Sequence, residues 1–235
     1  PESWLRARAE AAADVGRRAI GSPFELFRDV RWRKNTIVGI FLGWWYAKRL
    51  VRNQAIWGPA GSPMKPADID DFVVWCAVGI ILGGRVGYVL FYDFPRFVEN
   101  PLEIFALWHG GMSFHGGFLG VLGAAAFFAW RRRVDWWRLM DFVAPCVPTG
   151  LASGRIGNFI NGELWGRAAD PGLPWAMRFP QSGTDIARHP SPLYQFALEG
   201  LLLFVLLWWY GLRQHRLGQV SGAFLIGYGL FRFIA

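Results

Sequence analysis

The sequence predicts an all-α polytopic membrane protein, and three observations carry this prediction. Of its 235 residues, 53% are hydrophobic and only 18% are charged, and the mean hydropathy is positive at +0.23. Glycine occurs 29 times, a content that is familiar from closely packed transmembrane helices. Two cysteines are too few for a disulfide-stapled secreted fold, and so apolar a chain does not stay disordered in water. One membrane-embedded unit is the class that remains.

Apolar segments mark the expected helices. A helix needs roughly 17 to 25 apolar residues to cross ~30 Å of hydrocarbon, and five segments approach that length. A sixth segment, residues 37–47, is too short to span unless its helix begins inside the polar residues that precede it. We therefore expect about six transmembrane helices. The five longer segments are residues 72–92, 113–130, 139–154, 193–212 and 217–235.

Two hydrophilic parts flank or interrupt these helices. Residues 1–36 carry eight Lys or Arg among scattered apolar residues, a pattern typical of a basic amphipathic arm on a membrane surface. Residues 161–192 are rich in Gly, Pro, Asp and Arg, which predicts a large loop. The expected organisation is an N-terminal arm over 1–36 and a transmembrane domain over 37–235 that includes this loop.

Basic residues in the short connections predict the orientation. Ten Lys or Arg fall in connections on one side and one, Arg96, on the other, so the basic side is expected to face the cytoplasm. Residues 95–111 and 161–192 are then extracytoplasmic. The basic arm opposes this orientation, and we expect it to bind anionic lipid of the outer leaflet. Since Lys and Arg in such loops face headgroups, the pI of 10.1 is weak evidence for nucleic acid.

Six ionisable residues fall inside predicted spans. A charge at the centre of a membrane costs about 2.5 to 3.5 kcal/mol, so these residues must pair or line a polar cavity. Asp141 and Glu199 are expected mainly to hydrogen-bond between helices. The full set is Arg85, His115, Asp141, Arg155, Glu199 and Arg232.

The densest polar stretch is residues 154–166, Gly-Arg-Ile-Gly-Asn-Phe-Ile-Asn-Gly-Glu-Leu-Trp-Gly. Its glycines allow close backbone approach, and its polar residues supply a guanidinium fork, two amides and a carboxylate. Such a set suits a phosphate with neighbouring hydroxyls. It follows a helix interrupted by Pro145 and Pro148, and broken helices are tolerated in membranes where they line a cavity. The alternative is a polar helix-end packing motif.

This stretch resembles the signature of the bacterial prolipoprotein diacylglyceryl transferase family. Further segments resemble that family in the same order, so that the resemblance covers about residues 37–235: 83–92, 110–120, 141–145, 188–194 and 222–233. It implies a multi-pass enzyme of the bacterial inner membrane with a seventh helix, expected beyond Ala235. It also implies transfer of the diacylglyceryl group of phosphatidylglycerol to the lipobox cysteine of a prolipoprotein, with release of glycerol phosphate, and it implies no metal or other cofactor.

The resemblance also assigns roles to individual residues. His115 is expected to act as the base for the thiol, because a thiol of pKa ≈ 8.5 is mostly protonated at pH 7. Arg155 and Arg232 are expected to stabilise the phosphate as its charge grows. Arg85 is either a third phosphate contact or the structural partner of a carboxylate. The residues expected to hold and orient the headgroup are Asn158, Asn161, Glu163, Gly166 and Tyr228.

Each role has a structural alternative, and so has the function. His115 could be a hydrogen-bonded core histidine, Arg232 a side chain that snorkels to headgroups, and Tyr228 an interfacial anchor. The same arginines would also suit a membrane transporter that binds an anionic lipid. A third reading is an inactive fragment, since Arg33 follows Arg31-Trp32 where the family has an Arg-Trp-Tyr motif. The expected partners are phosphatidylglycerol, prolipoprotein signal peptides and the lipid bilayer, without nucleic acid.

Overall fold

The structure is a computed structural model that describes residues 30–57, 61–107, 110–213 and 215–235. Within these ranges the chain is helical, and the only β-type pairing consists of two isolated bridges that both involve Arg188. The all-α prediction is therefore confirmed for the described residues. The helices are α3 (Val30–Arg52), α4 (Gln54–Trp57), α5 (Pro66–Phe91), α6 (Phe94–Glu99), η2 (Pro101–Phe105), α7 (Phe114–Arg132), α8 (Trp136–Val143), η4 (Ala144–Cys146), α9 (Val147–Asn161), η5 (Pro180–Ser182), α10 (Ser191–Gln195), η6 (Phe196–Leu202), α11 (Leu203–Gly211) and α12 (Gln219–Ile234).

Helices occupy all six segments that the apolar pattern singled out. Among the described helices, two continuous stretches are long and apolar enough to cross a membrane by length and composition: Pro66–Phe91 with 26 residues and Ser191–Gly211 with 21. The expected span 139–154 is divided into α8, η4 and α9 around Pro145, which has no N–H to continue the ladder. Six complete spans therefore stay a prediction.

The short sixth segment belongs to a longer helix. α3 begins at Val30 and ends at Arg52, so its 23 residues include the polar residues that precede Ile37. The predicted boundary at residue 36 thus falls inside a helix. The rest of the predicted arm, residues 1–29, lies outside the described residues.

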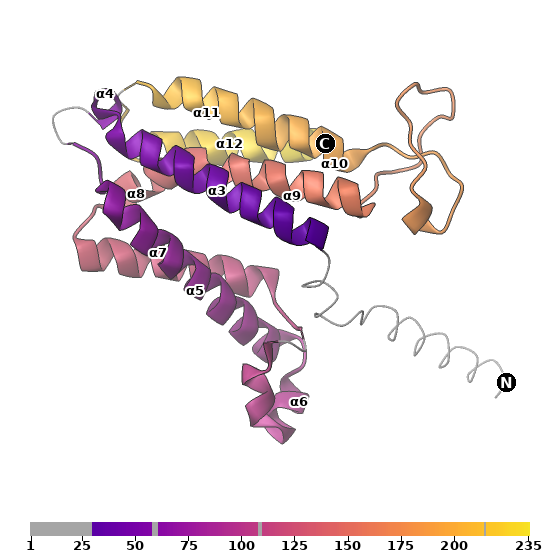
Figure 1. The fold of residues 1–235 in the computed structure, drawn as a ribbon, viewed down its shortest axis with the longest axis horizontal. Helices are drawn as coiled ribbons and strands as arrows, with labels where there is room; N and C mark the ends of the chain where they lie inside the picture. The colour runs from indigo at the N-terminus through magenta and orange to yellow at the C-terminus, as the bar shows by residue number, and fades with distance from the viewer. Residues whose placement is uncertain (1–29, 58–60, 108–109, 214) are drawn as a thin grey trace.

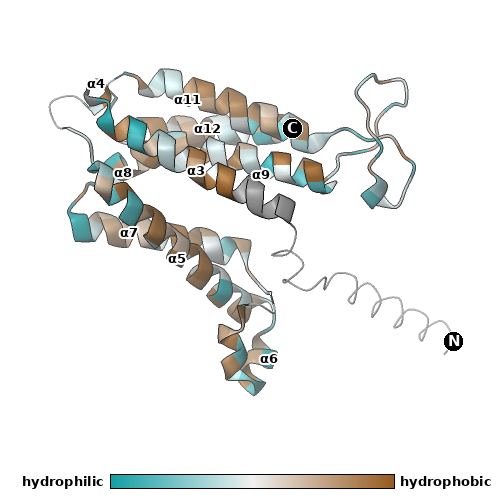
Figure 2. Cartoon of the chain, in the orientation of Figure 1, coloured by the Kyte–Doolittle hydropathy of each residue, from teal (hydrophilic) through white to brown (hydrophobic). Residues whose placement is uncertain are grey.

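Large apolar side chains cover the outer faces of the helices. Leu82 on α5 and Leu119 on α7 are 60% and 66% exposed, and many other large apolar side chains share this exposure. Figure 2 shows the apolar residues along both helices. Soluble monomers rarely leave such extended apolar area uncovered, which supports a location in the membrane.

The helices form two groups that meet at one end. α5 and α7 pair as a hairpin, whereas α3, α9, α11 and α12 form a bundle (Figure 1). Near α4 and α8, Ile69 and Phe128 of the hairpin pack with Tyr46, Leu139 and Phe142 of the bundle. From this joint the ribbons of the two groups diverge toward the end of the molecule where α5 ends and α7 and α10 begin (Figure 1).

Polar contacts reinforce the joint. Asp70 at the start of α5 accepts hydrogen bonds from Trp44 Nε1 at 2.6 Å and from Lys48 Nζ at 3.0 Å, both on α3. Arg132 at the end of α7 pairs with Asp68 at 3.3 Å and with Asp71. The Asp70 contacts attach the hairpin to the bundle at this end, and the Arg132 pairs tie α7 to α5 within the hairpin.

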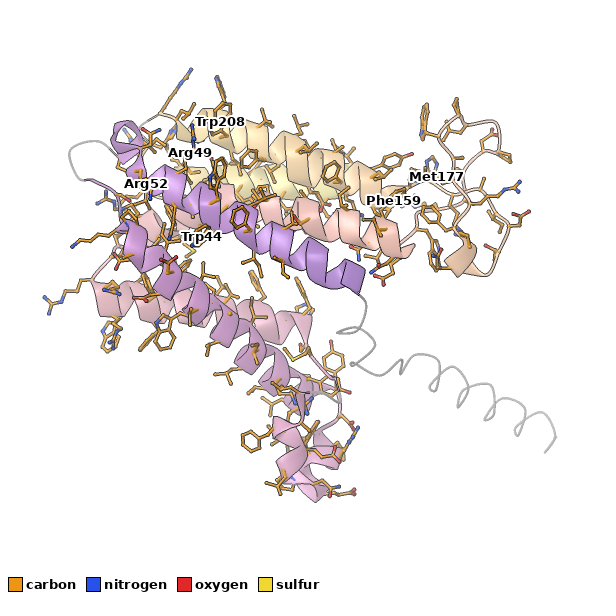
Figure 3. The ribbon with its side chains drawn as sticks, in the orientation of Figure 1. Trp44, Arg49, Arg52, Phe159, Met177 and Trp208 are labelled. Carbon is orange, nitrogen blue, oxygen red and sulfur yellow. The ribbon has the colours of Figure 1, made fainter. Side chains whose placement is uncertain are left out.

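Tryptophan and arginine side chains lie together at the joint. Figure 3 shows Trp44, Arg49, Arg52 and Trp208 at the joint, and Phe159 and Met177 toward the opposite end. The long connection between α9 and α10 extends from that opposite end, which also holds α6 (Figure 1). This separation agrees with the expected division of the connections into two faces, and the face that meets the cytoplasm stays a prediction.

Glycines allow α5 and α7 to approach closely. A Cβ atom at Gly83 would lie 2.3 Å from the carbonyl oxygen of Gly116, and one at Gly120 would lie 2.0 Å from that of Gly79. Real Cβ atoms do not approach backbone oxygens so closely, so any larger residue would push the helices apart. Small residues at a helix interface are a common device of membrane proteins.

We expect Gly120→Ala to destabilise the protein by about 1–3 kcal/mol because the added methyl group collides with α5. Thermal unfolding in detergent measures the effect. The matched control is Gly123→Ala on the same helix, where no atom lies within 4 Å of the added Cβ. Equal unfolding temperatures for the two variants would contradict the close packing of α5 against α7.

Candidate active site

The polar stretch of residues 154–166 covers the second half of α9 and the turn that ends it. Gly162 takes a left-handed conformation, with φ of 68°, at the C-terminal cap. The N–H groups of Gly162 and Glu163 then bond the carbonyl oxygens of Phe159 and Asn158 at 3.0 and 2.8 Å. Glycine suits this position because the conformation is costly for residues with a Cβ atom.

The turn gathers three of the predicted headgroup residues. Glu163 accepts a hydrogen bond from Asn158 Nδ2 at 3.2 Å and lies 3.5 Å from Asn161 Nδ2. Asn161 Oδ1 is buried and accepts no hydrogen bond among the described residues. The exposed carboxylate of Glu163 therefore orients two amides at the end of α9.

A cluster of three charged side chains lies between α9, η6 and α12 of the bundle. Glu199 on η6 is fully buried, and its Oε1 accepts a hydrogen bond from Arg232 Nη1 on α12 at 3.3 Å. Its Oε2 lies 3.5 Å from Arg155 Nη2 on α9. One carboxylate thus brings together the two arginines that the sequence assigned to a phosphate.

Hydrogen bonds fasten the loop between α9 and α10 where its two ends meet. The N–H of Gly166 donates to the carbonyl oxygen of His189 at 3.0 Å, and a Cβ at Gly166 would lie 2.6 Å from that oxygen. The His189 ring contacts the Tyr194 hydroxyl at 3.0 Å, and Trp175 donates to the same hydroxyl at 2.9 Å. Gly166 therefore allows two backbone segments to pass close to each other beside the polar turn.

Tyr228 lies on α12 one helical turn before Arg232, so the two side chains share a face of that helix. Its ring stacks on Phe224 with centroids 5.9 Å apart, and the side chain is half-buried. Tyr228 therefore lies on the same part of α12 as Arg232, which belongs to the arginine cluster.

An apolar groove lies along α9 and η6, two of the elements that carry the arginine cluster. It has a volume of about 430 Å³ and lies between α3, α9 and η6. Its lining includes Ile156 and Gly200, the neighbours in sequence of Arg155 and Glu199. An acyl chain is the kind of ligand that such an apolar surface suits.

His115 lies on the hairpin rather than in the bundle. It occupies the first turn of α7, after the cap at Ser113, whose Oγ accepts a hydrogen bond from the N–H of Gly116 at 3.2 Å. The imidazole is exposed and meets the Phe114 ring edge-on, with centroids 5.6 Å apart. Within the described ranges no hydrogen bond holds this ring, so the alternative of a hydrogen-bonded core histidine is not supported.

Arg85 is buried inside the hairpin end. Its five N–H groups make five hydrogen bonds, all to backbone carbonyl oxygens, so a phosphate contact would have to displace one of them. The structural role expected for Arg85 was pairing with a carboxylate, and the structure shows backbone carbonyls instead. The acceptors belong to Glu103, Ile104, Ala106, Gly110 and Gly111.

Comparison with known protein families shows to which family the chain is related. The family model described as prolipoprotein diacylglyceryl transferase matches residues 32–235. The chain belongs to the prolipoprotein diacylglyceryl transferase family. The resemblance inferred from residues 154–166 is thereby confirmed, and the match extends five residues further toward the N-terminus than the inferred 37–235.

Relatives of this transferase family share more than half of the aligned residues. The phosphatidylglycerol–prolipoprotein diacylglyceryl transferase of Methylibium petroleiphilum is 66% identical over 168 residues, which cover 72% of this chain and 64% of the relative. The enzyme of the same name from Polaromonas sp. is 54% identical over 210 residues, covering 88% and 75%. That from Mesorhizobium japonicum is 54% identical over 199 residues, covering 83% and 68%. The chain thus spans about two thirds of the length of the curated transferases it matches.

In this family member, the six ionisable residues of the predicted spans find four kinds of environment. Arg155, Glu199 and Arg232 form one cluster, Arg85 binds carbonyl oxygens, and His115 is exposed. Asp141 accepts from the N–H groups of Gly218 and Ser221 at 2.7 and 2.8 Å, so it caps α12 and confirms the expected bond between helices. Sequence reasoning missed Glu199 as the shared partner of both arginines, although the need to neutralise buried charge pointed to an acidic residue.

We expect Arg85→Met to destabilise the protein by roughly 2–4 kcal/mol and to loosen residues 103–106 and 110–111, because several buried carbonyl oxygens lose their donors. Thermal unfolding and limited proteolysis of the loop measure both effects. The control is Arg96→Ala, which removes an exposed ion pair with Glu103 from the same loop and should cost less than about 1 kcal/mol. Similar losses for both variants would refute the anchoring role of Arg85.

Proposed function

We propose that this chain transfers the diacylglyceryl group of phosphatidylglycerol to the lipobox cysteine thiol of prolipoproteins and releases glycerol phosphate, the first step of lipoprotein maturation. The observation that carries the proposal is the cluster of Arg155 and Arg232 on Glu199, in a chain of the prolipoprotein diacylglyceryl transferase family. Two guanidinium groups whose remaining donors have no partner among the described residues suit a phosphodiester. The apolar groove along α9 and η6 suits its acyl chains.

The reaction exchanges one bond for another. The sulfur of the lipobox cysteine forms a bond to the glyceryl carbon that bears the phosphate oxygen, and the bond between that carbon and oxygen breaks. Both electrons of the broken bond leave with the oxygen as glycerol phosphate, and the thiol proton passes to His115. Positive charge at the phosphate lowers the barrier because the leaving group gains negative charge as the bond breaks.

The other site residues would hold the headgroup. In this proposal Asn158, Asn161 and Glu163 bind the hydroxyl groups of the glycerol, since the turn presents amide and carboxylate groups together. Tyr228 contributes its hydroxyl from α12, and Gly166 keeps the loop close to the turn. Arg85 contacts the headgroup only if it exchanges a carbonyl partner for the phosphate.

We place the enzyme in the bacterial inner membrane as a multi-pass protein with its active site toward the extracytoplasmic side. The proposed catalytic domain extends from α3, which begins at Val30, to residue 235, and the proposed membrane-surface arm is limited to the residues before α3. The exposed apolar helix faces support a location in the bilayer. The basic and tryptophan-rich end near the joint would face the cytoplasm, as the positive-inside rule predicts.

The test is a transfer assay with the purified chain in vesicles of phosphatidylglycerol and a fluorescent lipobox peptide. The expected product is a diacylglyceryl peptide of reduced gel mobility, together with glycerol phosphate. Two matched controls are a peptide in which serine replaces the cysteine and vesicles of phosphatidylethanolamine, and neither should yield product. Binding of phosphatidylglycerol without any transfer would instead support a lipid-binding membrane protein.

A further inference from the structure

Glu199 is the most deeply buried ionisable side chain of the described bundle, with 0% exposure. It belongs to η6, a π-helical segment between the α-helical segments α10 and α11. π-Helical turns are rare and are frequently found at functional sites. The two ion pairs of Glu199 reach α9 and α12, so this carboxylate connects three elements of the bundle.

Small residues bring these elements together. A Cβ at Gly200 would lie 2.8 Å from the Cβ of Ala152, so glycine lets η6 approach α9 next to Glu199. A Cβ at Gly227 would lie 2.7 Å from Leu203 Cδ1, so glycine also lets α12 approach α11. The ion pairs therefore depend on close helix packing rather than on long side chains that reach across water.

The contacts of the cluster leave both arginines with spare donors. Each guanidinium has five N–H groups, and each reaches Glu199 through one nitrogen. In the described part of the chain, no other hydrogen bond or ion pair involves the Arg155 or Arg232 side chains. Arg155 is largely buried, with 17% of its side chain exposed, whereas Arg232 is 49% exposed. A phosphate could thus bind both guanidinium groups while Glu199 stays in place.

The net charge of the cluster matches a phosphodiester better than a phosphomonoester. Two arginines and one glutamate sum to a single positive charge, whereas a phosphodiester carries a single negative charge. A phosphomonoester carries about 1.5 to 2 negative charges at pH 7, so it would gain most from a cluster without the carboxylate. Electrostatic interactions of this kind are strong at a buried site, where little water screens them.

We propose that Glu199 is a positioning residue that orients Arg155 and Arg232 and lowers the charge of the phosphate site from two positive charges to one. The site then binds a phosphodiester and still releases a phosphomonoester. This inference rests on the proposed function for its substrate and product, glycerol phosphate. It assigns no direct contact between Glu199 and the reacting atoms.

The test is Glu199→Gln, which keeps the shape of the side chain and removes its charge. We expect kcat to fall on the order of 10- to 100-fold because the guanidinium groups lose their fixed orientation. The KM for phosphatidylglycerol should not rise, because the site gains positive charge. The inhibition constant of glycerol phosphate should fall at least about fivefold for the same reason. A residue with a merely structural role would not make the product bind more tightly.

A matched control removes another carboxylate that pairs with an arginine. Asp71→Asn breaks the pair with Arg132 at the joint, on an exposed side chain, and should leave kcat and product inhibition unchanged. Circular dichroism and thermal unfolding establish that each variant is folded. If Glu199→Gln does not fold, Glu199→Asp replaces it: its shorter carboxylate should lower kcat and leave product inhibition unchanged.

A double variant tests whether Glu199 acts through the arginines. In an Arg232→Lys background, Glu199→Gln should lower kcat clearly less than it does in the unaltered chain, because one of the groups it orients is gone. Equal effects in the two backgrounds, or unchanged product inhibition in folded Glu199→Gln, would overturn the proposal.

Direct titration with glycerol phosphate separates this inference from the proposed function. If the unaltered chain makes no diacylglyceryl peptide, the proposed function fails. The comparison of glycerol phosphate binding between the unaltered chain and Glu199→Gln still decides the role of Glu199. Tighter binding by the variant supports the inference, and equal or weaker binding refutes it.

Discussion

Replacing Arg155 by alanine is expected to reduce diacylglyceryl transfer by at least about 100-fold, the usual cost of removing one group that stabilises transition-state charge. The reason is geometric as well as electrostatic. Arg155 lies on the half of α9 that leads into the polar turn, and its guanidinium reaches Glu199 at 3.5 Å with donors to spare. The transfer assay with the lipobox peptide measures the loss.

The control must exclude damage from an unpaired buried carboxylate. Removing one partner of a buried ion pair costs about 3–5 kcal/mol when no other partner remains, and here Arg232 remains. The double variant Arg155→Ala with Glu199→Gln removes both charges and should stay as inactive as the single variant. Arg132→Ala, at the joint, should remain active. Near-normal transfer by Arg155→Ala would show that Arg155 does not bind the phosphate.

Replacing His115 by alanine is expected to lower transfer by about 100- to 10,000-fold, the usual contribution of a general base. His115→Gln should not restore activity, because an amide can hydrogen-bond a thiol but cannot take its proton. Folding should be unaffected, since the His115 ring is exposed and makes no hydrogen bond among the described residues. Surface substitutions of this kind usually change stability by less than about 0.5 kcal/mol.

Alkaline pH gives a second readout for His115. The thiolate fraction of a free cysteine of pKa ≈ 8.5 rises roughly 25-fold between pH 7 and pH 9. Part of the lost activity of His115→Gln should therefore return at pH 9, because the substrate thiol then loses its proton without a base. Full activity of the glutamine variant at pH 7 would mean that the imidazole acts as a hydrogen-bonding group.

Much of the fold could be predicted from local patterns. The apolar segments located α5, α7 and α12 to within a few residues, apart from an earlier start of α5 at Pro66, and Pro145 marked the interruption before α9. The beginning of α3 could not be located, because residues before Ile37 are polar and carry no apolar signal. The hydrophobic pattern therefore does not reveal the first turns of α3, which only the backbone of the structure shows.

The candidate site was only partly predictable. Asn158, Asn161 and Glu163 are close in sequence and share one turn, so their association could be expected from spacing alone. Arg155, Glu199 and Arg232 come from three elements, and Glu199 and Arg232 are 33 positions apart in the sequence. Nothing local in the sequence distinguishes Glu199 from Asp141, although the first pairs with arginines and the second caps a helix.

Sequence patterns alone were sufficient for the helical membrane class, for the family and for the residues of the proposed phosphate site. The first follows from composition and periodicity, and the other two follow from the resemblance of short motifs, all of which are properties of neighbouring residues. Three features became visible only in the folded molecule. Glu199 pairs with both arginines, the Arg85 N–H groups all donate to backbone carbonyl oxygens, and His115 lies on the separate hairpin. Those outcomes depend on how helices that are distant in the sequence pack together. A buried charge pairs with a group that this packing brings within contact distance.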